Sequence, residues 1–303
     1  MPFQINKMLV GVDGSETSDY ALNIGLKLGD VYSARLDLLH VGRGMIPVSP
    51  QIFDPLLGTT GIPMPTPKPT PEFASNKPAE GGLAPLVADR RKVVLAHGLQ
   101  CSGIQIDSDD VSGEILKTSA VGKYDLIVLG SKGFRGIKGF LLGSVSQKIA
   151  KEAKRSVLIV KTRIDTIPKI LLGYDGSEES RLALEVASSL AKKFRGQVRV
   201  VSVVSVPISA EGYMISDMDK WEREMRDHMD NAISMLRAEG VNAEGKVVDF
   251  ADVSRALIDE AERGSFDMIV VGNRGQGRLK SLFLGSVASG IANSAKTNVL
   301  IVR

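Results

Sequence analysis

The sequence of 303 residues contains a single cysteine, no cluster of basic residues, and no apolar run near the ~20 residues of a membrane span. Cys101 therefore has no partner for an internal disulfide or a metal pair, and we expect it to pack as a small buried hydrophobe. A net charge of only +3 does not favour nucleic acid as a partner, and nothing favours membrane insertion. The opening residues enter a strand-like segment at once, without room for a cleaved apolar signal, so a cytoplasmic location is predicted.

The two halves of the chain repeat each other, which indicates two domains of one kind. Met8–Glu16 reads MLVGVDGSE and returns 162 residues later as ILLGYDGSE at Ile170–Glu178. Two later segments repeat at 142 residues instead, Asp125–Gly130 as Asp267–Gly272 and Val157–Val160 as Val299–Val302. Since 162 minus 142 is 20, the first half carries 20 extra residues. We predict domains at 1–162 and 168–303, joined by the short polar segment Thr162–Pro168.

The extra residues belong to a proline-rich stretch at 45–85, which holds ten of the thirteen prolines. Proline fixes the backbone angle φ and lacks an amide donor, so Pro47–Pro85 is predicted to be neither helix nor central strand. We expect a long surface loop there, and such loops are either functional lids or merely solvated.

Each half alternates short apolar runs with helical stretches, which is typical of a parallel sheet covered on both faces. The expected strands of the first half are Met8–Val12, Arg35–His40, Ile104–Ile106, Leu126–Leu129 and Val157–Val160. The helical stretches are those of Leu22–Leu28, Val87–Leu99, Ile115–Ala120 and Val145–Ala153, then Leu182–Lys193, Asp217–Glu239, Ala256–Arg263 and Val287–Ala295. Five strands and four helices per half predict two doubly wound, Rossmann-like α/β domains in tandem.

Ligands of such sheets bind at the carboxyl ends of the strands, where two motifs of each half fall. The first half has Asp13-Gly-Ser after its first strand, then Gly130-Ser-Lys-Gly133, nine residues, and Gly143-Ser144 opening a helix. The second half repeats this order with Asp175, Gly272-Asn-Arg-Gly275 and Gly285-Ser286. Glycines that approach an anion closely or reach positive φ, beside free amides at a helix start, predict a phosphate-chain ligand. The alternative is that these glycines are only turn residues.

Basic residues surround both glycine motifs, because Lys132 and Lys138 align with Arg274 and Lys280. Positive charge suits a polyphosphate, although solvated loop charge explains it equally well. Neither half has the P-loop pattern or a Gly-x-Gly-x-x-Gly after its first strand, so ATPases and dehydrogenases of those classes are not indicated.

Strand-Asp-Gly-Ser, Gly-x2-Gly-x9-Gly-Ser and the final Val-Leu-Ile-Val strand together resemble the universal stress protein family in a tandem arrangement. The resemblance implies an adenine nucleotide alpha hydrolase-like fold, and both motif copies have the pattern of the ATP-binding members. It implies that ATP, with Mg2+, is held by Gly130, Gly133, Gly143, Ser144 and the Val145 amide, with Asp13 at the nucleoside and the Val41 backbone at adenine. In the second half it implies Gly272, Gly275, Gly285, Ser286, Val287, Asp175 and Val203 in the same places.

Two positions depart from the family's pattern. Ser156 and Asn298 stand where the family commonly has proline before its last strand, which we expect to affect strand entry rather than the pocket. Ser146 becomes Ala288 in the second half, so a hydroxyl is in question there alone.

The resemblance also implies that the last strands pair about a two-fold axis. An exposed edge such as Val157–Val160 must be covered, and Val299–Val302 of the same chain is its natural antiparallel partner. We therefore expect an intramolecular pseudo-dimer whose two sites face each other across it. A homodimer of the tandem chain remains the alternative.

Nothing in the sequence indicates catalysis, because no base or set of metal-binding carboxylates can be named. His40, His97 and His228 lie at unmatched positions in the two halves and are expected to be satisfied or at the surface. The apolar stripe of the helix at Asp217–Glu239 is explained by packing. The sequence thus favours a non-catalytic or very slow ATP-binding stress regulator with an unknown protein partner. The alternative is a scaffold that acts through its proline-rich insertion or an oligomer surface.

Overall fold

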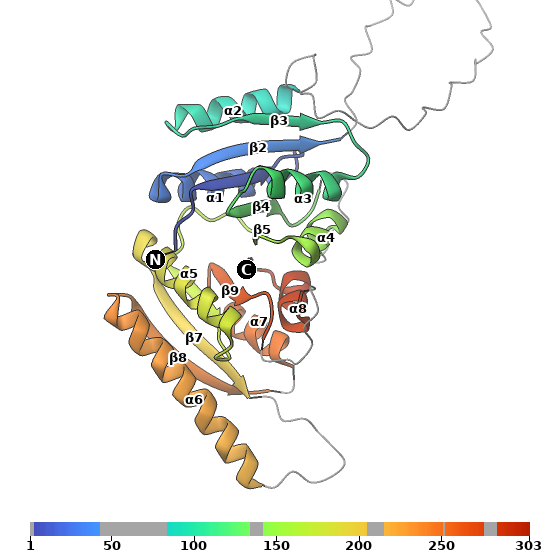
Figure 1. Cartoon of the computed structure of the whole chain (residues 1–303). Coiled ribbons are helices and arrows are strands. Elements are labelled where there is room, and N and C mark those ends of the chain that lie inside the picture. The colour runs from blue at the N-terminus through green and yellow to red at the C-terminus, as the bar shows by residue number, and fades with distance from the viewer. Residues whose placement is uncertain (1–2, 43–83, 134–141, 205–214, 251, 276–283) are drawn as a thin grey trace, which may run out of the picture.

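The computed structural model describes residues 3–42, 84–133, 142–204, 215–250, 252–275 and 284–303 (Figure 1). The elements of the first half are β1 (Lys7–Gly11), α1 (Glu16–Tyr32), β2 (Arg35–Val41), α2 (Pro85–Ala96), β3 (Gly103–Ile106), α3 (Val111–Val121), β4 (Leu126–Gly130), α4 (Ser144–Glu152) and β5 (Ser156–Val160). Those of the second half are β6 (Lys169–Gly173), α5 (Glu178–Phe194), β7 (Gln197–Val204), α6 (Ile215–Ala238), β8 (Asn242–Asp249), α7 (Val253–Gly264), β9 (Met268–Gly272), α8 (Ser286–Ser294) and β10 (Asn298–Val302).

The ten strands of these residues form one sheet in the order β3-β2-β1-β4-β5-β10-β9-β6-β7-β8. Within each half all pairings are parallel, and strand order switches beside β1 and again beside β6. The halves meet where β5 and β10 pair antiparallel, with Leu158 opposite Leu300. The predicted doubly wound fold and the predicted pairing of the last strands are therefore confirmed.

Side-chain alternation along the strands sends helices to both faces of the sheet (Figure 1). Met8 and Val10 of β1 point into one apolar cluster with α1, α2, α5 and α6, whereas Leu9 points into a second cluster with α3, α4, α7 and α8. Every residue of β5 and of β10 is buried. The strands are continuously apolar because helices cover both faces of the sheet, as predicted from the sequence.

The structure corrects one boundary in the proline-rich stretch. Residues 43–83 lie outside the described part, but Pro85 opens α2, so the predicted loop ends before it. Proline is tolerated at the first position of a helix because its missing amide would have no helical partner there. The junction between the halves is also less polar than expected, because Ile167 is completely buried. Cys101 is 8% exposed, as predicted, and its burial raises the pKa of the thiol to about 11.

The two residues that replace the family's proline hold the junction of β5 and β10 together. Asn298 is fully buried, and its Oδ1 accepts hydrogen bonds from the backbone amides of Lys161 at 2.8 Å and Thr162 at 3.1 Å. Ser156 Oγ accepts the backbone amide of Arg303 at 3.2 Å. Their side chains thus do more than affect strand entry, because each one accepts backbone amides of the residues that follow the last strand of the other half.

A search of the described helices finds none with both the length and the apolar character needed to cross a bilayer.

Candidate functional site

The turn after the first strand of each half fixes an aspartate at the carboxyl edge of the sheet. Asp13 Oδ1 accepts the Ser15 amide at 2.9 Å, and Ser15 Oγ in turn accepts the Ser18 amide at 3.2 Å and caps α1. Gly14 between them has a φ of +81°, a conformation that other residues adopt only with strain. The second half repeats the turn with Asp175 and Ser177, whose amide lies 3.0 Å from the carboxylate.

The second glycine of each loop lies against this aspartate. A methyl group added at Gly133 would lie 2.9 Å from Asp13 Oδ2, and one at Gly275 would lie 2.4 Å from Asp175 Oδ2. In both halves the fold therefore brings together the aspartate and the second loop glycine, which are 120 residues apart in the first half (133 minus 13) and 100 in the second (275 minus 175). Any larger residue at these positions must displace the carboxylate.

The first glycine of each loop serves packing. A Cβ at Gly130 would lie 2.6 Å from the Thr17 carbonyl carbon at the start of α1, and one at Gly272 would lie 2.8 Å from Glu179 in α5. Positive φ occurs at none of the glycines of the two Gly-x2-Gly-x9-Gly-Ser motifs, all of which lie in the described part of the chain, so for these glycines that expected reason is wrong. Close approach of neighbouring atoms is the physical reason instead.

The third glycine of each motif starts a helix whose first amides have no side-chain cap. Gly143 and Gly285 are the N-cap residues of α4 and α8, and neither helix has a side-chain cap hydrogen bond. By contrast, serine or aspartate side chains cap α1, α3, α5 and α7. The amides that open α4 and α8, at Ser144–Val145 and Ser286–Val287, thus keep donors and a positive dipole end for an anion.

The first loop is braced more heavily than the second. Ser15 Oγ and Thr17 Oγ1 both donate to the Lys132 carbonyl, at 3.1 and 2.7 Å. Ser146 Oγ donates to the Gly130 carbonyl at 2.7 Å. In the second half Glu179 and Ala288 stand in place of Thr17 and Ser146, so these two hydroxyl braces are missing. The Ser146 hydroxyl, which the second half lacks, therefore supports the glycine loop of the first half.

The remaining expected site residues lie at the same edge. Val41 ends β2 and Val203 is the penultimate residue of β7, each on the strand beside the aspartate turn. Lys138 and Lys280 fall in 134–141 and 276–283, outside the described residues. The strands of the two halves run in opposite directions where β5 meets β10. The expectation that the two sites face each other stays a prediction.

The histidines differ in their surroundings. His40 Nδ1 lies 2.7 Å from the Val12 carbonyl, and His97 is half exposed, so both are as expected. His228 is not satisfied: its Nδ1 is buried without a hydrogen-bond partner and lies against Gly176 of the second aspartate turn. Among the described residues, no three His, Cys, Asp or Glu side chains come together as a metal site.

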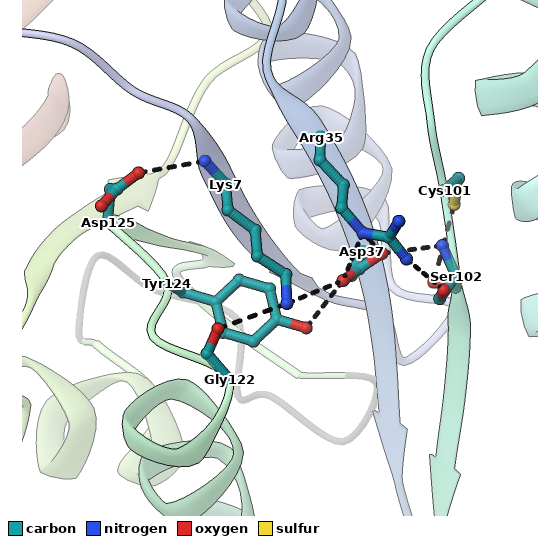
Figure 2. A network of polar contacts seen from close by, with 8 residues as sticks. All are labelled: Lys7, Arg35, Asp37, Cys101, Ser102, Gly122, Tyr124 and Asp125. Carbon is teal, nitrogen blue, oxygen red and sulfur yellow. Dashed lines mark hydrogen bonds and ion pairs between the residues drawn. The ribbon is translucent and has the colours of Figure 1, made fainter.

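Sequence reasoning missed a buried ionic cluster at the amino edge of the first half-sheet (Figure 2). Asp37 of β2 is 2% exposed and accepts hydrogen bonds from Tyr124 Oη at 2.8 Å and the Ser102 amide at 2.7 Å. Arg35 Nε lies 3.0 Å and Lys7 Nζ 3.6 Å from its carboxylate. Burial, then the bond to Asp37, raises the pKa of Tyr124. A lone aspartate within an apolar strand was the available signal.

The second half carries the same cluster with its charges inverted. Arg199 stands at the position of Asp37, and its guanidinium lies 2.8 Å from Glu260 and over the ring of Phe266. Glu260 is 3% exposed and also pairs with Lys246 at 2.7 Å. Because the inverted cluster lies at the edge opposite the glycine loops, we read both clusters as structural.

Two α/β half-sheets joined through their last strands, each with a glycine loop beside an aspartate turn, define a tandem doubly wound α/β protein. The sequence pattern of the universal stress protein family matches residues 63–161 and 166–303. The chain belongs to the universal stress protein family and contains two of its domains.

Known proteins agree with this assignment. A universal stress protein of Mycolicibacterium smegmatis is 27% identical over 310 aligned positions, which cover 98% of this chain and 96% of that protein. Universal stress protein YxiE of Bacillus subtilis is 33% identical over 156 residues, covering 52% of this chain and 99% of YxiE. The crystal structure of a universal stress protein from Archaeoglobus fulgidus aligns with a TM-score of 0.64 at 22% identity over 99% of both chains, which shows the shared fold.

Proposed function

We propose that the chain binds one adenine nucleotide in each half and acts as a non-catalytic regulator. The observation that carries this proposal is the pair of uncapped helix N-termini at Gly143 and Gly285, each beside a glycine loop and an aspartate carboxylate. Capping side chains are present at α1 and α5 directly across from these loops. Their absence at α4 and α8, where the glycine loops end, is what an anion-binding end requires.

In this proposal, different groups of each site would contact the phosphates, the ribose and the adenine of ATP. The amides opening α4 and α8 would donate to phosphate oxygens, with Lys132 and Arg274 adding positive charge. The carboxylates of Asp13 and Asp175 are acceptors for ribose hydroxyls, and the backbone at Val41 and Val203 is available to adenine. Mg2+, when present, would supply charge neutralisation of the phosphates.

We propose a binding role rather than turnover, because hydrolysis needs a base or water-orienting group near the terminal phosphate. Among the described histidines, His40 contacts the Val12 carbonyl just before the first aspartate turn, and His228 lies against Gly176 of the second. A nucleotide-dependent surface read by a protein partner is then the means of regulation.

Isothermal titration with ATP and magnesium chloride tests the proposal. Two sites are expected in the wild-type chain, one in each of the single variants Gly133→Val and Gly275→Val, and none in the double variant. Each single variant is the control for folding of the other, since a misfolded chain would lose both sites. No heat in the wild type would refute nucleotide binding and favour the scaffold alternative. Multiple-turnover phosphate release would overturn the non-catalytic role.

We also propose that the pseudo-dimer needs no second copy of the chain, because β5 and β10 cover each other's edges. Sedimentation velocity should show a monomer; larger species alone would support the homodimer instead.

A further inference from the structure

A buried lysine of the first half holds the end of a helix in the second. Lys161 follows β5, and its Nζ donates to the carbonyls of Ala292 at 2.6 Å and Ala295 at 2.5 Å, at the end of α8. A cation at this end of a helix satisfies orphan carbonyls and opposes the negative end of the helix dipole. Lys161 is therefore a charged cap that crosses from one half to the other.

The last residue of the chain makes the mirror contact. Arg303 follows β10, and its guanidinium donates to the carbonyls of Ala150, in the last turn of α4, and Arg155, at 3.2 Å for the latter. We call these two contacts, Lys161 to α8 and Arg303 to α4, the cross-braces. They are related by the same pseudo-two-fold symmetry as the strands.

Each cross-brace begins at a glycine loop. The Ser131 amide of the first loop donates to the Val160 carbonyl at 2.8 Å, one residue before Lys161. The Asn273 amide of the second loop donates to Val302 at 2.9 Å, one residue before Arg303. The first loop is thus connected through two consecutive residues to the end of α8.

The charges of the glycine loops also act on the two buried cations, Lys161 and Arg303. Burial, and after it the neighbouring charge of Lys132, lowers the pKa of Lys161 to about 8. Burial, and after it Arg274, lowers the pKa of Arg303 to about 10. An anion bound at either loop would offset the loop cation and so weaken its repulsion of the buried cation.

Each helix held by a cross-brace starts at the other site. The carboxyl end of α8 contacts the Lys161 side chain, beside the first loop, and its N-cap residue is Gly285 in the second site. The carboxyl end of α4 contacts the Arg303 side chain, beside the second loop, and its N-cap residue is Gly143 in the first site. One rigid element with one charged contact therefore joins the two sites in each direction.

We propose that the cross-braces couple the two sites, so that a polyphosphate nucleotide bound in one half strengthens binding in the other. This inference rests on the proposed function. Filling the first site offsets Lys132, so charged Lys161 is repelled less and holds the end of α8 more firmly. The first amides of α8 then meet the second ligand in better order. Repulsion between the two ligands is small, because α4 and α8 are each nine residues, or about 14 Å, long, beyond the ~8 Å screening length.

The test is a coupling factor measured by titration with ATP and magnesium chloride. The factor is the product of the two stepwise binding constants of the two-site chain, divided by the product of the single-site constants. Gly133→Val and Gly275→Val supply the single-site constants in each background. We expect a factor of about five in the wild type, near the lower end of measured couplings. We expect about one in the Lys161→Met/Arg303→Met variant.

Lys161→Arg is the matched control, because it keeps the charge and should restore the wild-type factor from the Lys161→Met level of about two. Circular dichroism checks that each variant is folded. If the double variant is unfolded, the coupling factor of Lys161→Met alone tests the proposal. A wild-type factor of one, or a factor that survives Lys161→Met, overturns the coupling while leaving nucleotide binding intact. No heat in any chain refutes the proposed function itself.

Hydrogen exchange gives a second readout that a purely structural brace would not change. In Gly275→Val, where ATP binds only in the first half, ATP should slow amide exchange at the end of α8. The protection should disappear in Gly275→Val/Lys161→Met and return with arginine at position 161. Exchange in α8 that does not respond to ATP would contradict the mechanism.

Discussion

Replacing the buried Asp37 by alanine is predicted to destabilise the fold by about 3–5 kcal/mol. Its carboxylate accepts Tyr124 Oη at 2.8 Å and the Ser102 amide at 2.7 Å, and alanine leaves both donors without a partner. Each stranded buried donor costs about 1–3 kcal/mol. Arg35 and Lys7 are about one-third exposed and recover much of their hydration, so they add little.

Urea denaturation followed by circular dichroism measures the change. Asp37→Ala/Tyr124→Phe removes one of the stranded donors, so it should lose less than the sum of the single variants by about 1–2 kcal/mol. Asp89→Ala breaks an exposed pair with Lys92 and serves as the control, with an expected change within about 0.5 kcal/mol. A loss below about 1 kcal/mol in Asp37→Ala would refute this reading of the cluster.

Three further outcomes are expected. Asn298→Ala removes a fully buried acceptor from the backbone amides of Lys161 and Thr162 and should lower the free energy of unfolding in urea by about 2–4 kcal/mol. Ser156→Ala removes the acceptor of one amide and should cost about 1 kcal/mol, so equal losses would contradict the unequal bonding. Gly275→Ala places a methyl 2.4 Å from its aspartate and should weaken ATP binding in its half about tenfold, more than Gly133→Ala at 2.9 Å; titration of single-site chains showing the reverse order would be inconsistent with the geometry. The pKa of Lys161, lowered from 10.5 to about 8 beside Lys132, means that the unfolded chain binds the extra proton between these values. Stability should therefore rise with pH from 8 to 10.5 relative to Lys161→Arg, and a difference that is flat with pH would exclude the shift.

Much of the site could be predicted because its parts are local. Asp13, Gly133 and Gly143 follow strands or open helices, and parallel strands bring their carboxyl ends to one edge whatever the details of packing. The role of each glycine could not be read in this way. Gly130 meets the start of α1 and Gly133 meets Asp13, and both contacts depend on how a helix and a turn pack across the sheet. The mechanism first expected, positive φ, applies to Gly14 and Gly176 instead.

The buried clusters and cross-braces were beyond sequence reasoning for the same reason. Asp37 appears in the sequence as one charge inside an apolar strand, and its partners come from three other segments of the chain. Lys161 looks like an ordinary polar residue after a strand. Only the antiparallel pairing places it against the carbonyls of α8.

The sequence by itself determined the repeat, the alternation of strands and helices, and the edge at which ligands would gather. These follow from residue spacing, since apolar runs of strand length and helix length have few ways to cover a parallel sheet. The tertiary structure decided how the halves are joined: one continuous sheet with an antiparallel pair at its centre, and Lys161 and Arg303 each holding a helix of the other half. The physical reason is that charge-dipole contacts and strand direction between distant segments depend on three-dimensional packing, which no local pattern encodes.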